Sequence, residues 1–291
     1  VATNGGNVRD YKGLGGKRIP PLPLIAIPTT AGSGSEVSPK FVITDEESGE
    51  KMTIGGPECF PRAAILDPVL LERLPYRQAI ISSLDALTHA VEGYLAVGAT
   101  PLTDALALGA IEVIYRKLLP AARGSDLEDK NDMLLASSMA NIACGSAGLG
   151  LIHAMSHGLP EVPHGFGCAA LLIPVLEFNL PACTAKMAQM ATALGVSPKA
   201  VGVGESLGVG ARESLGVGAR ESEAARRAID NLRRLYEDIG FPGSIIASPY
   251  LEIPLQDRVD KSVRWGARLM KSNPRQASAD DVAEVFRRVI G

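Results

Sequence analysis

Four histidines and one aspartate are spaced so that they could bind a metal ion together. Every histidine of the chain lies between His89 and His164, and Asp85 precedes the first of them by four positions. His153 and His157 are also four positions apart, and side chains at this spacing project from one face of a helix. Imidazole nitrogens and a carboxylate oxygen suit a divalent transition metal. The spacing therefore predicts one shared metal site rather than separate core histidines, without deciding between His153 and His157 as ligand.

The cysteines offer a second, softer set of donors. The four cysteines are scattered and form no Cys-x-x-Cys pair, a pattern that indicates reduced thiols in a cytoplasmic protein. Cys168 and Cys183 lie near the histidines in sequence and could be soft metal ligands. Their apolar neighbours favour buried structural thiols instead, which is a common environment for free cysteine.

Composition excludes several classes of protein. A chain of 291 residues with 46% hydrophobic and 21% charged residues can bury a substantial core in one large or two ordinary domains. Its net charge of -3 gives no reason to expect a nucleic-acid or anionic-membrane partner. The longest apolar run, residues 169–176, is shorter than the roughly 20 residues of a membrane-spanning helix. We therefore expect a globular cytoplasmic protein.

Short strands and turns are expected in the first 75 residues. Residues 24–27 form an apolar run after several prolines and predict a buried strand. Residues 41–44 and 51–54 flank a polar turn and predict a hairpin. Residues 63–66 predict one more apolar strand. Directly after the first strand, residues 28–36 form a Gly/Ser/Thr loop that could offer N–H groups and hydroxyls to a phosphate. Alone this loop is a weak signal, because it lacks the spacing of the known phosphate motifs.

Helices are expected from about residue 76 to the end of the chain. Apolar residues recur at helical spacing over residues 78–96. Pro120 is expected to stop the next helix, because proline removes a backbone hydrogen bond. Residues 148–157 are rich in small side chains, which suits close packing around a site. The other helices are expected over residues 102–119, 127–144, 185–194, 222–238, 255–271 and 279–290.

Several of these motifs occur in an order that resembles the iron-containing (group III) alcohol dehydrogenase family. The resemblance covers nearly the whole chain, and it rests on separate motifs that agree in order and approximate distance. These motifs are the loop of residues 28–36, Asp85-x-x-x-His89 leading to Glu92-Gly-Tyr94, Gly150-Leu-Ile-His153-Ala-Met-Ser-His157, Pro163-His-Gly165 and Asn273-Pro274-Arg275.

The resemblance implies a fold in two parts. Residues 1–75 would be the remnant of an α/β dinucleotide-binding domain, and residues 76–291 an all-α metal-binding domain, in the architecture of dehydroquinate synthase. It also implies roles for individual residues. The metal ligands would be Asp85, His89, His153 and His164, and His157 would be a nearby catalytic histidine that holds substrate or relays a proton. The cofactor-binding residues would be Thr29, Thr30, Ser33 and Lys51.

The implied function is a metal-dependent alcohol dehydrogenase. It would transfer hydride between a small alcohol or aldehyde and NAD or NADP, with Fe²⁺ or Zn²⁺ as Lewis acid and the nicotinamide supplying the hydride chemistry. A homo-oligomer is compatible with this function. Two alternatives are a metal-binding remnant without catalysis and an NAD- and metal-dependent lyase of the dehydroquinate synthase type. The lyase would need a basic cluster for a phosphorylated acid, which the sequence does not suggest.

Two features depart from the family pattern. The chain begins at Val1 rather than methionine and lacks the family's upstream Gly-Gly-Gly-Ser phosphate loop, which indicates an N-terminal truncation. We expect such a chain to bind NAD weakly and to oxidise alcohols poorly. Only six residues separate His157 from His164, fewer than is usual in the family, and this spacing predicts that His164 reaches the metal imperfectly.

Overall fold

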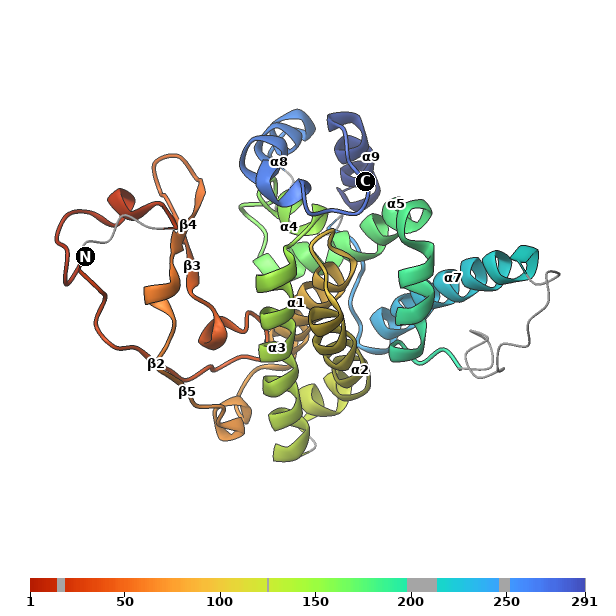
Figure 1. Cartoon of the computed structure of the whole chain (residues 1–291), viewed down its shortest axis with the longest axis horizontal. Helices are drawn as coiled ribbons and strands as arrows, with labels where there is room; N and C mark the ends of the chain where they lie inside the picture. Colours follow the sequence, from red (N-terminus) through yellow and green to blue (C-terminus); the bar gives the residue numbers. More distant parts are fainter. Residues whose placement is uncertain (15–18, 125, 198–213, 246–251, 291) are drawn as a thin grey trace.

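The chain consists of a small region of strands and turns followed by a larger helical body. The computed structural model describes residues 1–14, 19–124, 126–197, 214–245 and 252–290. In Figure 1 the strands (red to orange) lie to one side of a central group of helices, and the C-terminal helices (blue) lie at the top. This order of elements agrees with the prediction of an α/β segment followed by helices.

The predicted hairpin is present and belongs to a three-stranded sheet. β3 (Lys40–Thr44) and β4 (Lys51–Gly55) pair antiparallel, with Thr44 opposite Lys51. β1 (Gly13–Leu14) pairs with β4 in parallel on its other side. The hairpin positions Lys51 at the start of β4, so that its side chain can extend toward the helices.

The second sheet differs from the expectation of buried strands. β2 (Ile25–Ala26) and β5 (Ala63–Ala64) form a two-stranded parallel pair. Ile25 is 60% exposed, and Leu24 and Ile27 are about half exposed. The prediction of a buried strand at residues 24–27 was wrong, because an apolar run is buried only where another layer covers it. Two 3-10 helices lie between strands, η2 (Ser35–Val37) and η3 (Pro57–Cys59), while η1 (Val8–Tyr11) precedes β1 and η4 (Pro68–Leu71) follows β5.

Three long helices form the centre of the helical body. α1 (Tyr76–Leu95) packs against both α2 (Pro101–Arg123) and α3 (Leu127–Ala147). Every residue of α1 from Ile80 to Leu95 is buried, polar ones included. A helix buried on all sides can keep polar residues only where they have partners or a function, so α1 is the natural place to look for a site.

Pro120 does not end α2 as predicted. The helix continues to Arg123 and is closed by Gly124, whose φ of 80° places it in the left-handed conformation common after helix ends. Pro120 lies in the last turn of α2, where only a few residues follow it. The cost of one missing hydrogen bond there is offset by packing, because Leu118 is fully buried.

α5 (His164–Ala193) was missed over most of its length, since only residues 185–194 were expected to be helical. It is buried on most sides and so lacks a polar face, and it contains Pro174 and Pro181. A non-helical residue, Cys183, marks a kink. Among the described helices, α5 is long and apolar enough to cross a membrane, but 56% of its most apolar stretch is buried, as in a core helix.

The remaining helices flank this centre. α4 (Leu151–Ser156) is short and packs on α8 (Leu255–Met270), while α9 (Ala279–Ile290) packs against α8 and α5. α7 (Ser214–Asp238) packs on α5 and begins earlier than the predicted residue 222. α8 and α9 agree with the predicted helices to within a residue.

Candidate metal centre

Three helices bring the predicted metal-binding side chains together. α1 carries Asp85 and His89, α4 carries His153, and α5 begins at His164. Asp85 Oδ1 lies 3.8 Å from His164 Nε2. The ring of His153 lies between the other two imidazoles, with its centroid 4.7 Å from that of His89 and 5.4 Å from that of His164.

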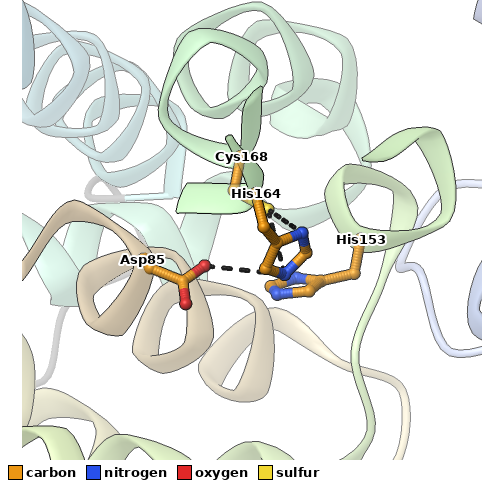
Figure 2. A group of neighbouring side chains, drawn as sticks. All are labelled: Asp85, His153, His164 and Cys168. Carbon is orange, nitrogen blue, oxygen red and sulfur yellow. Dashed lines mark hydrogen bonds and ion pairs between the residues drawn. The ribbon is translucent and has the colours of Figure 1, made fainter. Parts of the chain in front are cut away.

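Donor atoms from four side chains converge at one point (Figure 2). Asp85, His153, His164 and Cys168 each contribute one potential ligand atom, and these atoms all lie within 4.8 Å of one another. His89 lies outside this group and stacks on His153 with nearly parallel rings. Three of the four predicted ligands are therefore in the group, the fourth is adjacent, and Cys168 is an addition.

The buried atoms at the centre have the properties that a cation requires. Asp85 and His153 are 6% and 5% exposed, yet neither Asp85 Oδ1 nor His153 Nε2 has a hydrogen-bond partner among the described residues. His89 Nδ1 is also without one in that part of the chain. An unpaired buried polar atom is costly unless something binds it. A carboxylate and imidazoles aimed at one point fit a divalent transition metal.

Glu92 orients His153, and its role was missed in the sequence. Its Oε2 lies 2.6 Å from His153 Nδ1, and its Oε1 accepts a hydrogen bond of 2.6 Å from the backbone N–H of Ile152. Metal-binding histidines commonly hold a carboxylate with the nitrogen that does not bind the ion. The sequence did indicate that Glu92 lies near the site, because Asp85, His89 and Glu92 recur at the spacing of one helix face.

Burial and neighbouring charges set the protonation state of each side chain at the centre. Burial would raise the pKa of Asp85, but the three histidines around it lower that pKa below its ordinary value. Burial lowers the pKa of His89, and partial desolvation together with His153 and Lys51 lowers that of His164, whose side chain is still 44% exposed. Burial opposes protonation of His153 too, but Cys168 and Glu92 raise its pKa well above the usual range. The metal-free centre therefore has an ionised carboxylate beside neutral imidazoles at His89 and His164, and a metal ion would have to displace the proton of His153.

A buried arginine holds the short connection between His157 and His164. Arg258 of α8 is fully buried, and its Nη2 lies 2.6 Å from Glu161 Oε1. Its Nη1 donates to the carbonyl of Gly158 at 2.9 Å. These contacts hold the six-residue segment at its first and fourth residues, and His164 reaches the group despite the short spacing.

His157 and Lys51 lie together at the C-terminal end of α4. His157 caps the C-terminus of α4, one turn beyond His153, and its ring centroid is 6.4 Å from that of Trp265. Burial and the nearby Lys51 lower the pKa of His157 to about 4. Lys51 Nζ donates to the carbonyl of Ser156 at 3.4 Å, and burial lowers its pKa as well. Lys51 thus lies beside the metal group.

The Gly/Ser/Thr loop is docked on the outer side of α1 and α3. Asn141 donates to the carbonyl of Ser33 at 2.6 Å, and Ser138 donates to the buried carboxylate of Glu36 at 2.5 Å. Gly34 has a φ of 60°, and a Cβ atom there would lie 2.4 Å from that of Asn141. Thr29 and Ser33 are exposed and Thr30 is half-buried. The backbone of this loop is therefore held against α1 and α3, while the hydroxyl groups of its threonines and of Ser33 stay accessible.

Comparison with known proteins defines the class to which this fold and site belong. Residues 79–290 match the C-terminal domain of the Fe-containing alcohol dehydrogenase family, and residues 1–68 match iron-containing alcohol dehydrogenase. The chain belongs to the iron-containing alcohol dehydrogenase family. Members of this family are oxidoreductases that use a nicotinamide cofactor and iron, so the predicted family, fold class and cofactors are confirmed.

Individual relatives agree with this assignment. The NAD-dependent methanol dehydrogenase of Bacillus methanolicus is 35% identical over all of this chain and 72% of its own length. The crystal structure of a 1,3-propanediol oxidoreductase superposes with a TM-score of 0.87 and 33% identity, over 99% of this chain and 72% of that one. The structure of an alcohol dehydrogenase from Oenococcus oeni superposes with a TM-score of 0.86 and 30% identity, over 99% of this chain and 71% of that one. These relatives favour the dehydrogenase prediction over a lyase.

Proposed function

We propose that this protein transfers hydride between a small alcohol or aldehyde and NAD at the metal centre between α1, α4 and α5. The observation that carries the proposal is the pair of buried atoms without partners, Asp85 Oδ1 and His153 Nε2, which point to one position beside His164. The family match supports the reaction class. The relatives' substrates, methanol and 1,3-propanediol, suggest short primary alcohols and diols.

We propose Asp85, His153 and His164 as metal ligands, and His89 as the fourth ligand that the family pattern implies. A divalent cation, Fe²⁺ or Zn²⁺, would act there as a Lewis acid on the substrate oxygen. Glu92 holds His153 so that its Nε2 lone pair faces the centre. The ionised Asp85 offsets part of the cation's charge.

The remaining predicted residues are proposed to serve substrate and cofactor. His157 has an Nδ1 atom without a described hydrogen-bond partner, and its low pKa keeps it neutral at pH 7. It can therefore accept the alcohol proton or hold the substrate hydroxyl. Lys51 lies beside this histidine and would approach the cofactor from the hairpin. Thr29, Thr30 and Ser33 would contact the cofactor from the docked loop.

We also propose a cytoplasmic protein whose partners are small molecules, with a homo-oligomer as its assembly. Its four free cysteines and weak net charge support this proposal, with no nucleic-acid or membrane partner expected. Sedimentation analysis of the purified protein would test the assembly.

NADH formation measured by absorbance tests the function. Protein loaded with Fe²⁺ or Zn²⁺ is given NAD and a panel of short primary alcohols and diols, and NADP is compared with NAD. We expect slow turnover, limited by weak NAD binding, that requires metal and is lost in His153→Ala. Binding of both metal and NAD without oxidation of any alcohol would contradict the proposal, and would move the lyase alternative ahead.

A further inference from the structure

Cys168 is placed as a metal-binding residue would be. It lies on α5 one turn after His164, and its side chain is fully buried. Its Sγ atom is 3.8 Å from both ring nitrogens of His164. Figure 2 shows the thiol directed at the same point as Asp85 and His153. It is the only cysteine in this group within the described parts of the chain.

The neighbours of Cys168 give independent evidence that something binds here. Asp85 Oδ1 and His153 Nε2 are more than nine-tenths buried and without hydrogen-bond partners among the described residues. Two donors bound to one zinc ion at about 2.0–2.3 Å, at tetrahedral angles, lie roughly 3.3–3.6 Å apart. His164 Nε2 lies 3.8 Å from both Asp85 Oδ1 and Cys168 Sγ, and all four donor atoms lie within 4.8 Å of one another, so the side chains would have to draw together around an ion.

We propose that the Cys168 thiolate binds the metal ion directly, alongside Asp85, His153 and His164. On binding, the S–H bond breaks, a sulfur–metal bond forms, and the proton leaves to solvent. The proposal rests on the proposed function only for the presence of a metal centre, and not for its catalytic activity. His89, which stacks on His153, stays the ligand that the family pattern implies, and Cys168 would bind the ion in addition to it.

A thiolate ligand changes which metal the site selects. Sulfur is a softer donor than imidazole or carboxylate and favours zinc over harder divalent ions. A site with Cys168 as a ligand should therefore prefer Zn²⁺ over Fe²⁺ more strongly than one built from histidine and aspartate alone. The centre would discriminate between metals through Cys168, a residue whose apolar sequence neighbours predict a structural thiol in the core.

Cys183 provides the matched control. It lies on the same helix, is 8% exposed, and donates a hydrogen bond to the carbonyl of Asn179 at 3.1 Å. It is therefore a buried thiol with a structural partner. Replacing either cysteine by serine removes one buried sulfur, but only Cys168→Ser removes a donor from the metal group.

The experiment uses Co²⁺ as a spectroscopic substitute for the native metal. A thiolate bound to Co²⁺ gives an intense charge-transfer band in the near ultraviolet, which nitrogen and oxygen ligands do not give. We expect this band in the wild-type protein and in Cys183→Ser, and its loss in Cys168→Ser. In competition between Zn²⁺ and Fe²⁺, Cys168→Ser should lose about 10–100-fold of the preference for Zn²⁺, comparable to other changes around metal sites.

Each outcome separates this proposal from the proposed function. Co²⁺ binding to the wild-type protein without the band would overturn Cys168 as a ligand, even if Cys168→Ser failed to fold. A band that survives in Cys168→Ser would also overturn it. If Co²⁺ did not bind at all, the metal centre itself would be refuted. A Cys168-dependent band in a protein that oxidises no alcohol would uphold the ligand and refute the dehydrogenase.

Discussion

Glu92 Oε2 and His153 Nδ1 lie 2.6 Å apart in the interior of the protein, joining α1 to α4. Both side chains are about 5% exposed, and the second oxygen of Glu92 accepts the N–H of Ile152. The carboxylate therefore fixes both the backbone and the ring of α4. The position of α1 relative to α4 therefore determines, through this pair, the direction in which His153 Nε2 points.

Glu92→Gln should weaken the metal centre without removing a ligand. The amide can still bond to Ile152 or to His153, but it lacks the charge that makes the imidazole a stronger donor. We expect metal affinity to fall by about 10–100-fold. Titration with Zn²⁺ in competition with a chelator measures this loss. Glu112→Gln, at an exposed position that pairs with Arg116, is the control and should leave affinity unchanged.

Alanine variants should show that His89 and His153 bind the metal and that His157 does not. His153→Ala should abolish stoichiometric metal binding, because it removes a donor and leaves Glu92 unpaired. His89→Ala should also lose metal if the family pattern holds. His157→Ala should retain metal and lose only turnover. Elemental analysis of the purified variants decides this. Full metal content in His89→Ala would make His89 a packing residue, and loss of metal in His157→Ala would refute the assignment of His157.

Gly34→Ala should displace the cofactor loop. The new Cβ would lie 2.6 Å from the carbonyl of Ser137 and even closer to Asn141, in a conformation that already disfavours a side chain. We expect at least a tenfold loss of NAD affinity relative to the unchanged protein, with metal binding intact. Gly124→Ala is the matched control, because Gly124 also has a positive φ but faces open space. It should cost about 1 kcal/mol of stability and leave NAD binding unchanged. Equal effects of the two variants on NAD binding would contradict this role of the loop.

The stability of the metal-free protein should fall with acidification, in part through His157. Burial and Lys51 lower its pKa from 6.5 to about 4. The unfolded chain binds this proton below about pH 6.5, whereas the folded protein resists it until about pH 4. The stabilising contribution is therefore present above pH 6.5 and is lost as the pH falls toward 4. His157→Gln should reduce the loss between pH 7 and pH 4.5 by roughly 1–3 kcal/mol in urea unfolding. An equally steep decline in the variant would disprove the shift.

The proposed boundary near residue 75 can be tested directly. A protein that begins at Leu74 should remain helical and bind metal, because every proposed ligand lies beyond that point and α1 begins at Tyr76. It should lose NAD binding, since residues 28–36 are removed. Circular dichroism and metal titration measure both properties. An unfolded chain would mean that the contacts of Gly32 with Ser82 and of Glu36 with Ser138 are integral to the helical core.

Local patterns in the sequence were enough for much of the fold and for part of the site. The hairpin of β3 and β4 follows from two apolar runs around a polar turn, and α8 and α9 follow from their polar and apolar faces. The pairs at i, i+4 placed Asp85 with His89 and indicated a metal. Such features depend on neighbours a few residues apart, and these the sequence displays directly.

Only the tertiary structure decided which distant segments pack together and which side chains they bring into contact. α5 shows no helical periodicity because it is buried on most sides, and the strand at β2 is exposed because no described layer covers it. Cys168 looks like a core residue when it is considered with its sequence neighbours alone, and the spacing of Glu92 after His89 does not show that it contacts His153. They reach the metal group because α1, α4 and α5 meet there, and the donors that face a bound ion are set by the packing of the three helices.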